Sequence, residues 1–266
     1  MTVLAAQRRD VILDLVRRSG AARVSELTKS LGVSDMTIRR DLDLLARQGL
    51  LEKVHGGATA ASSTFEPGFE AKSLREKPEK LAIAAVARDL VEPGTAIGLG
   101  AGTTTWTLAH ELRHTPGLTV VTNSMEVANV FHHGPHDDQT VILTGGVRTR
   151  SGALVGPVAV RALRGLNLDM GFMGVHGMDP DAGFTTPNLM EADTNRALAT
   201  ASRRVVVVAD HTKWGTIGVA TFARLEEAVV LVTDDGLPDT ARLILGERVG
   251  ELLVADRQDR VRGRSA

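Results

Sequence analysis

Residues 34–49 read SDMTIRRDLDLLARQG, and the spacing of their apolar residues predicts an amphipathic helix. Ser34 is a residue type that favours the N-cap position, and Asp35 would set a negative charge at the positive end of the helix dipole. The expected buried stripe consists of Ile38, Leu42 and Leu45. The opposite face is polar and rich in arginine, so the helix can pack on one side and bind a partner with the other.

Two shorter helical patterns precede this helix, at 6–18 and 24–32, and an apolar strand with a glycine turn follows it at 50–58. Only Gly32 and Val33 separate the second and third helices, which suits the tight turn of a helix-turn-helix. Three short helices followed by a hairpin predict a winged helix-turn-helix domain over residues 1–58.

The outward face of the third helix predicts contacts with double-stranded DNA. Arginine suits guanine edges and phosphate oxygens, and the N-terminal half of such a helix enters the major groove. The candidate DNA contacts are Ser34, Met36, Thr37, Arg39, Arg40, Arg47 and, in the wing, His55. Taken alone, the same arginines could belong to an ordinary solvated helix face, but the flanking helices and the wing favour the DNA-binding interpretation.

The charge distribution agrees with a nucleic-acid partner for this domain only. Residues 1–60 carry 10 Lys+Arg against 7 Asp+Glu, whereas the remaining residues carry 21 against 25, so a net charge of -1 conceals a basic head on an acidic body. The absence of cysteine excludes disulfides and thiolate metal sites and fits the cytoplasm. The charged N-terminus is not a signal peptide, and no apolar run approaches the length of a membrane span.

Residues beyond the head predict a linker, a second domain and a tail. Small residues, glycine and proline dominate 59–75, which we expect to be a linker, and 257–266 form a charged tail. Between them, over 76–256, short apolar runs alternate with helical patterns, as in a doubly wound α/β domain with a parallel sheet. The expected strands are 96–100, 118–123, 140–146, 170–175, 204–210 and 227–234. The expected helices between them are 103–113, 124–132, 156–165, 189–201 and 238–246.

The stretch GLGAGTTT at 98–105 connects an expected strand to an expected helix. Glycines let the backbone approach an anion, and the helix N-terminus offers free N–H groups. The Gly-Lys-Ser/Thr ending of a Walker A loop is absent, and the third glycine comes one residue too early for a dinucleotide fingerprint. The stretch therefore predicts either a phosphate-binding turn or a plain glycine-rich turn.

Other polar residues follow the expected strands, where ligands bind in open α/β sheets. Lys213 could contact a phosphate or be a surface lysine, and His176 could be a packed residue. The candidate effector contacts are Gly100, Ala101, Gly102, Thr103, Thr104, Thr105, Thr122, Asn123, Ser124, His176, Glu191 and Lys213. His132, His133 and His136 form a loose cluster that we expect to be solvated, so we expect neither a metal nor a cofactor.

These motifs together resemble one protein family. Residues 8–58, with TIRRDL and VHGGA, resemble the DNA-binding head of DeoR-type bacterial repressors. Residues 101–105 (AGTTT), 120–124 (VVTNS), 183–193 (GFTTPNLMEAD) and 205–215 (VVVVADHTKWG) resemble the sugar-phosphate sensor domain of that family. The resemblance implies a repressor that leaves operator DNA when a phosphorylated sugar binds, and an oligomer, dimer or tetramer, formed through the sensor domain.

The sensor domain of that family is similar in fold to ribose-5-phosphate isomerase, which raises a second hypothesis. An isomerase-like enzyme carrying a DNA-binding head would use Glu191 or Asp193 as base and Lys213 as electrostatic stabiliser. The chain departs from the family pattern at Gly100 and Ala101, where an acidic residue and a serine are usual, and at His176, where aspartate is usual. Histidine in place of the usual aspartate at position 176 removes a carboxylate from the region where the isomerase keeps its catalytic acids. Turnover of a sugar phosphate is therefore less credible, and we expect no catalytic residues.

Overall fold

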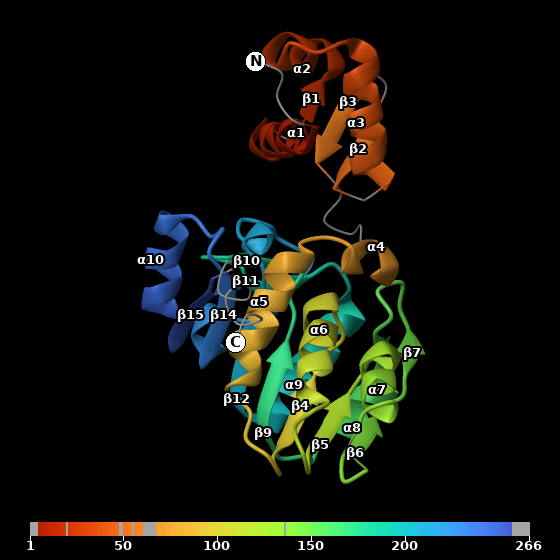
Figure 1. Ribbon diagram of the computed structural model, residues 1–266, viewed down its shortest axis with the longest axis vertical. Helices are drawn as coiled ribbons and strands as arrows, with labels where there is room; N and C mark the ends of the chain where they lie inside the picture. The colour runs from red at the N-terminus through yellow and green to blue at the C-terminus, as the bar shows by residue number, and fades with distance from the viewer. Residues whose placement is uncertain are drawn as a thin grey trace, which may run out of the picture. The chain divides into compact units, whose positions relative to one another are not determined.

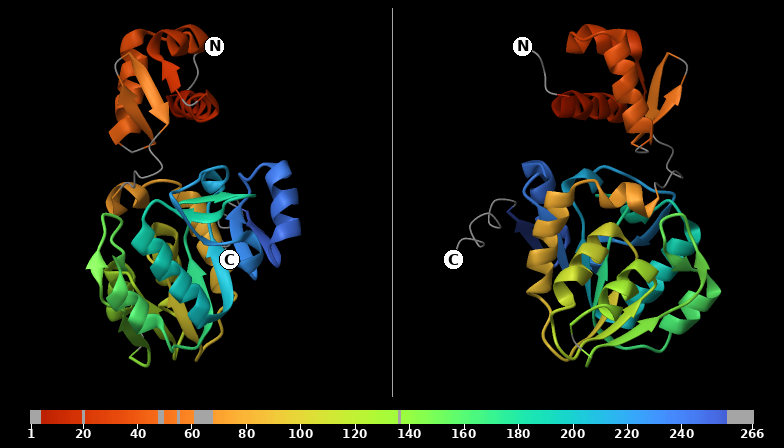
Figure 2. Two further views of the ribbon diagram at one scale, coloured as in Figure 1. Left: turned by 180° about the vertical axis from the view of Figure 1, so that it is seen from behind. Right: turned by 45° about the vertical axis from the view of Figure 1, so that its right-hand side comes forward.

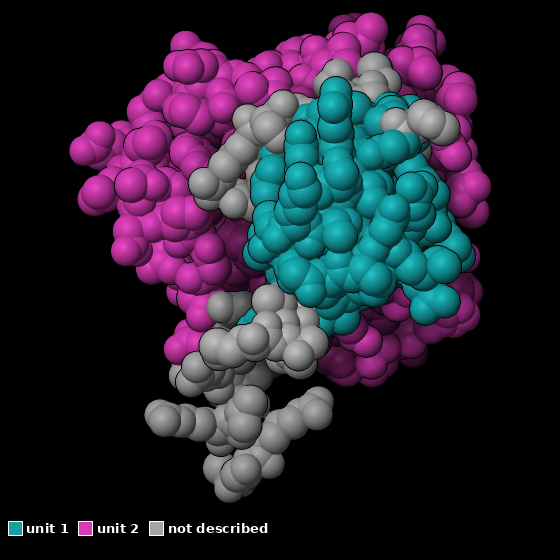
Figure 3. Space-filling model, turned by 90° about the horizontal axis from the view of Figure 1, so that it is seen from above, with its two compact units in different colours: residues 1–67 teal, residues 68–266 magenta. Residues whose placement is uncertain are grey.

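The computed structural model describes residues 5–19, 21–47, 50–54, 56–60, 68–135 and 137–256. The chain divides into two compact units, residues 1–67 (unit 1) and 68–266 (unit 2), which Figure 3 shows in different colours. The predictions for His55, His136, residues 61–67 of the linker and the tail 257–266 lie outside the described residues. No helix of the described part is long and apolar enough to cross a membrane.

Unit 1 is a winged helix-turn-helix, as predicted. Its described elements are α1 (Ala5–Ser19), β1 (Ala21–Arg23), α2 (Val24–Leu31), α3 (Asp35–Arg47), β2 (Leu51–Val54) and β3 (Gly57–Ala60). The strands form an antiparallel sheet in the order β1-β3-β2, so the wing hairpin gains a third strand that the sequence did not predict. Gly57 allows this pairing, because a Cβ there would lie 2.3 Å from the carbonyl oxygen of Ala22.

The stripe predicted on α3 is the centre of the core of unit 1. Ile38 and Leu42 are fully buried, and Leu45 is nearly so. They pack with apolar residues of both other described helices of unit 1, among them Ile12 of α1 and Leu27 of α2. Gly32 ends α2 in the left-handed conformation, with φ 65°, so the chain can turn directly into α3. The packing leaves the arginine-rich face of α3 outside the core.

The described part of unit 2 is built on a seven-stranded parallel sheet in the order β15-β14-β12-β9-β4-β5-β6 (Figure 1). The strands are β4 (Ala96–Leu99), β5 (Thr119–Thr122), β6 (Thr140–Leu143), β9 (Leu168–Met173), β12 (Ser202–Val208), β14 (Val230–Asp234) and β15 (Glu251–Ala255). The helices are α4 (Phe69–Ser73), α5 (Lys77–Arg88), α6 (Thr103–Leu112), α7 (Met125–His132), α8 (Pro157–Leu163), α9 (Leu189–Ala201) and α10 (Asp239–Arg248). The doubly wound prediction is confirmed.

Helices cover both faces of this sheet (Figure 2), and alternate strand residues point to opposite cores. Val206 packs with the layer of α5, α6 and α7, whereas Val207 packs with the layer of α8, α9 and α10. In β4, Ile97 and Leu99 face the first layer. Gly98 faces the second, where a Cβ would lie 2.6 Å from Leu198 of α9. Glycine in this strand therefore lets α9 approach the sheet closely.

Several short elements surround the carboxyl ends of the strands. They are β7 (Val147–Arg148), β8 (Leu154–Val155), β10 (Gly177–Asp179), β11 (Gly183–Thr186), β13 (Ala220–Ala223) and the 3₁₀ turn η1 (His211–Lys213). A second 3₁₀ turn, η2 (Leu225–Glu227), precedes the amino end of β14. The range expected as a linker, 59–75, also contains the helix α4. Its Phe69 ring stacks edge-on against Trp106 of α6, at 5.8 Å between centroids. A tertiary contact thus orders a segment whose composition alone favours an irregular chain.

The strand order places a topological switch point at β4. The chain passes from β4 to β5 on one side, and β9 pairs with β4 on the other. Ligands of doubly wound folds bind outside the carboxyl ends of the strands at such a point. Residues 98–105 leave the sheet here and lead into α6.

Candidate functional site

Helix α3 presents the residues that the sequence predicts for DNA contact. Met36 is 63% exposed, and Arg39, Arg40 and Arg47 are exposed as well. Thr37 is half-buried, and its amide donates a hydrogen bond of 3.3 Å to Ser34 Oγ. These side chains share the face of α3 that points away from the core. His55 of the wing lies outside the described residues.

Ion pairs connect α3 to the rest of unit 1, and one pair lies on its exposed face, where Arg39 Nε donates to Asp35 Oδ1 at 2.6 Å. Arg8 Nε of α1 lies 2.6 Å from Asp41 Oδ2, and both side chains are about nine-tenths buried. On the surface, Lys53 of β2 holds Asp43 at 2.5 Å, and its hydrogen bond lowers the pKa of that carboxyl. Asp41 belongs to the TIRRDL motif, yet its role was not predicted, because only the fold brings Arg8 next to it.

In unit 2, the turn after β4 is held by the neighbouring strands. The amide of Gly100 donates to Phe172 O of β9 at 2.9 Å, and the amide of Ala101 donates to Asn123 Oδ1 at 2.8 Å. Thr105 Oγ1 closes the turn by donating to Gly100 O at 2.6 Å. Thr103 and Thr104 occupy the first turn of α6, where backbone N–H groups have no partner within the helix.

The polar residues after β5 support this turn. Thr122 Oγ1 donates to Leu99 O at 2.6 Å, and Asn123 Nδ2 donates to Leu154 O at 3.1 Å. Ser124 is the N-cap of α7 and accepts the amide of Val127 at 3.2 Å. All three predicted residues are buried, and the bonds of their side chains run to the protein itself.

Glu191 is buried at the start of α9 and accepts three hydroxyl groups. Thr149 lies 2.9 Å and Ser151 2.5 Å from Oε1, and Thr186 lies 2.9 Å from Oε2. Its carboxylate therefore anchors the 149–151 segment and β11 to α9. Asp193, the other candidate base, is exposed and paired with Arg196.

His176 and Lys213 lie in one polar neighbourhood. Burial, followed by the positive charges of Lys72 and Lys213, lowers the pKa of His176 to about 4, so its imidazole is neutral at neutral pH. Lys213 Nζ lies 3.7 Å from Oδ2 of Asp210, a fully buried carboxylate at the end of β12. Although burial opposes ionisation of Asp210, Lys213, Thr212 and Lys80 lower the pKa of this carboxyl on balance.

Sequence reasoning missed several residues of this neighbourhood. Asp210 and Asp234 end two adjacent strands, which was a usable signal, and His211 Nδ1 lies 2.7 Å from Asp234 Oδ2. This hydrogen bond raises the pKa of His211. Lys80 gave no such signal, because it lies on α5, more than 100 residues before Asp210 in the sequence.

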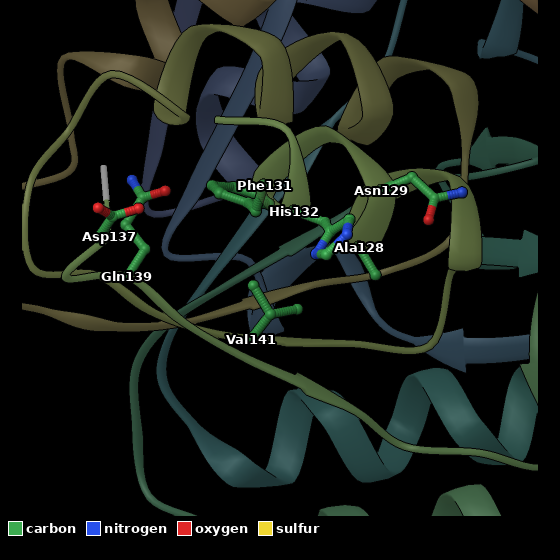
Figure 4. Close-up of a pocket in the computed structure, with 7 residues that line it drawn as sticks. All are labelled: Ala128, Asn129, Phe131, His132, Asp137, Gln139 and Val141. Carbon is green, nitrogen blue, oxygen red and sulfur yellow. The ribbon is translucent and has the colours of Figure 1, made fainter. Parts of the chain in front are cut away.

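A separate hollow lies at the opposite edge of the sheet (Figure 4). It is lined by Ala128, Asn129, Phe131, His132, Asp137, Gln139 and Val141. These residues come from α7, the segment after it and the start of β6, which is an amino-terminal strand end. The hollow contains none of the predicted effector contacts. Among the described residues, no group of three histidine, cysteine or acidic side chains could hold a metal ion.

Both units match known protein domains. The DeoR-like helix-turn-helix domain matches residues 8–64, and the DeoR C terminal sensor domain matches residues 75–235. Ribose 5 phosphate isomerase A from Neisseria gonorrhoeae matches with 17% identity and a TM-score of 0.38, covering 52% of this chain and 53% of that chain. A likeness of this size carries no argument about activity.

Relatives that align with most of this chain are named as transcriptional regulators. The uncharacterized HTH-type transcriptional regulator YgbI of Escherichia coli (strain K12) is 37% identical over 95% of this chain and 99% of its own length. The glycerol-3-phosphate regulon repressor of the same strain is 32% identical over 90% of this chain and 94% of its own. The putative aga operon transcriptional repressor of Escherichia coli O157:H7 is 32% identical, with coverages of 88% and 87%. These matches decide against the enzyme hypothesis, and the chain belongs to the DeoR family of DNA-binding transcriptional regulators.

Proposed function

We propose that this regulator represses a carbohydrate operon and leaves its operator when a phosphorylated sugar binds to unit 2. Two relatives named as repressors, of a glycerol-3-phosphate regulon and of an aga operon, support the repressor role. The observation that carries the effector proposal is the turn at 98–105. It lies at the switch point of the sheet and leads into the N-terminus of α6, a favourable position for a phosphate.

On this proposal, the predicted effector residues divide into two roles. Backbone N–H groups and the hydroxyls of Thr103 and Thr104 contact the phosphate directly. Thr105, Thr122, Asn123 and Ser124 position the turn, because their side chains already bond within the protein. His176 and Lys213 face the sugar or its phosphate. Glu191 keeps the neighbouring 149–151 segment in place through its hydrogen bond with Ser151.

On the DNA side, we propose that Arg39 and Arg40 contact bases or phosphates from the first half of α3, with Ser34, Met36, Thr37 and Arg47 around them. We further propose a cytoplasmic homo-oligomer joined through unit 2, because a symmetric assembly pairs two heads with two operator half-sites. Sedimentation of the full chain with and without its DNA tests the oligomer, and a monomer on a single half-site would contradict it.

The function is tested by selecting fragments of the source genome that the protein binds and adding sugar phosphates to the complexes in a gel-shift assay. We expect at least one sugar phosphate to dissociate the complex and to raise the melting temperature of the free protein. A ligand at 100 times its dissociation constant stabilises a protein by about 2.7 kcal/mol, which a thermal-shift screen detects. Specific DNA binding that no sugar phosphate alters would contradict the effector proposal.

A further inference from the structure

Residues 68–80, which we call the strap, cross the carboxyl-end edge of the sheet in unit 2. The strap comprises α4 and the first turn of α5, and it directly follows the chain that leads from unit 1. Phe69 of the strap stacks on Trp106 of α6, the helix that begins at the 98–105 turn. In Figure 1, α4 lies at the same upper edge of unit 2 as the arrowheads of the central strands.

The strap carries cations toward the candidate effector site. Lys72 lies close enough to His176 for its charge to lower the pKa of the imidazole, as does Lys213. Lys80, only 5% exposed, is coupled electrostatically to Asp210 and Lys213. Positive groups from the strap and from η1 therefore share one neighbourhood, which suits an anionic ligand.

Lys80 also holds the strap in shape. Its Nζ donates to Lys72 O at 2.7 Å and to Arg75 O at 2.6 Å, so one buried ammonium pins the turn between α4 and α5. Glu76, in this turn, has φ 44° and ψ 39°, a left-handed conformation that costs a residue with a side chain of order 1 kcal/mol or more. Strained backbone conformations of this kind cluster at ligand-binding sites, so the strain at Glu76, held by the buried Lys80, indicates a functional turn.

Arg75 is the second unusual feature of the strap. Its Nε and Nη2 atoms are buried, and among the described residues neither has a hydrogen-bond partner. Buried guanidinium nitrogens in folded proteins are normally satisfied, so these two donors point to an absent acceptor. A phosphate offers several acceptor oxygens and pairs with a guanidinium in a bidentate manner.

We propose that the strap is the closing wall of the effector site and that Arg75, assisted by Lys72, binds the anionic group of the effector. This inference rests on the proposed function and adds the residues that connect the effector site to unit 1, the DNA-binding unit. Because the strap begins where the chain from unit 1 enters unit 2, an anion bound to Arg75 stiffens the segment that carries the DNA-binding unit. Lys80 acts as a positioning residue, since its two bonds set where Arg75 lies.

The test compares the full-length wild type with Arg75→Met and with Arg203→Met as a matched control. Arg203 is an exposed arginine of the same unit, at the amino-terminal end of β12 on the opposite edge of the sheet, so its loss changes the net charge equally. The probes are inorganic phosphate and glucose 6-phosphate. Dissociation constants come from calorimetry, and hydrogen exchange is followed in peptides covering 68–80 and 98–106.

For wild type and Arg203→Met, we expect phosphate to slow exchange in both peptides. In Arg75→Met, we expect about tenfold weaker binding, the loss of one charge-assisted pair, and no protection of 68–80 at phosphate concentrations that still protect 98–106. Glucose 6-phosphate separates the sources of the anion. If it binds more tightly than phosphate and loses the same factor in Arg75→Met, the site takes the phosphate of a sugar rather than the free ion.

Equal phosphate affinity in Arg75→Met and wild type would overturn the inference, as would protection of 98–106 without any effect on 68–80. Both results leave the proposed function standing, because the turn alone would then hold the anion. If neither peptide responds to either probe in the wild type, the inference fails together with the anion site itself. Circular dichroism checks that Arg75→Met folds, and Arg75→Lys, which keeps the charge, is expected to bind with intermediate affinity.

Discussion

The two candidate sites of this protein are built in opposite ways. Helix α3 of unit 1 exposes its candidate DNA-contact residues along one face, and its other face packs in the core. The carboxyl-end edge of unit 2 buries its polar residues and bonds them within the protein: Thr122 and Asn123 donate to backbone carbonyls, and Glu191 accepts from Thr186. Double-stranded DNA is large and binds to an exposed protein surface, whereas a small phosphorylated ligand has to be enclosed by the protein. Substitutions should therefore act differently in the two sites.

The largest effect is expected beneath the exposed face, at Asp41. Replacing Asp41 by Ala leaves the buried Arg8 guanidinium without this carboxylate, and breaking a buried pair from one side costs about 3–5 kcal/mol. Both tryptophans, Trp106 and Trp214, lie in unit 2, so their fluorescence reports unit 2 while circular dichroism reports both units. We expect an early transition by circular dichroism only. A single unchanged transition would show that the pair does not stabilise unit 1.

The next effect concerns pH and unit 2. The folded-state pKa of His176 is about 4, below its usual 6.5, so the unfolded chain binds the proton more readily between these values. The contribution of His176 to the free energy of unfolding is therefore complete above pH 6.5 and is lost as the pH falls toward 4, by up to about 3 kcal/mol at 1.36 kcal/mol per pKa unit. Urea unfolding followed by tryptophan fluorescence should show a smaller acid loss in His176→Gln than in wild type. An equal loss of stability in acid for His176→Gln and wild type would contradict the assignment of this loss to His176.

On the exposed face, Arg40→Ala should weaken operator binding by about 1–3 kcal/mol if the guanidinium reads a base, or less and with a reduced salt dependence if it contacts a phosphate. Because Arg40 is exposed and outside the core, the free energy of unfolding should stay within about 0.5 kcal/mol of the wild type. Gel-shift titrations at two salt concentrations measure the affinity and its salt dependence, and urea unfolding followed by circular dichroism measures the free energy of unfolding. Wild-type affinity in the variant would remove Arg40 from the interface.

The smallest effect is expected at the first turn of α6. Thr103→Val and Thr104→Val each remove one hydroxyl donor while preserving shape, which costs about 1 kcal/mol for a neutral hydrogen bond. Operator affinity should be unchanged, and about fivefold more effector should be needed to release the DNA. Thr107→Val, one turn further along α6, is the matched control, since its hydroxyl bonds to Thr103 O. Release at the wild-type concentration in both variants would make this segment a plain turn.

Local patterns predicted much of both units. The 3.6-residue period of Ile38, Leu42 and Leu45 set the buried side of α3, and hence which arginines are exposed. The continuous apolar runs predicted β4, β5, β6, β9, β12 and β14, because a strand buried on both faces needs apolar residues at every position. The edge strand β6 is the exception, since it is exposed although its sequence is equally apolar. The short strands β7, β8, β10, β11 and β13 were missed, since two to four residues carry too little periodicity, and the edge strand β15 was missed as well.

The sequence by itself determined the winged head, the layered α/β unit and the glycine turn after β4, because each depends on residues close together in the chain. Only the tertiary structure decided that Thr105, Thr122 and Asn123 bond within the protein, and that Lys80 lies near enough to Asp210 and Lys213 to interact with their charges. The physical reason is that charges and hydrogen bonds act over a few ångströms in space. Lys80 and Asp210, more than 100 positions apart, become neighbours only when α5 packs against β12 and β14 of the sheet.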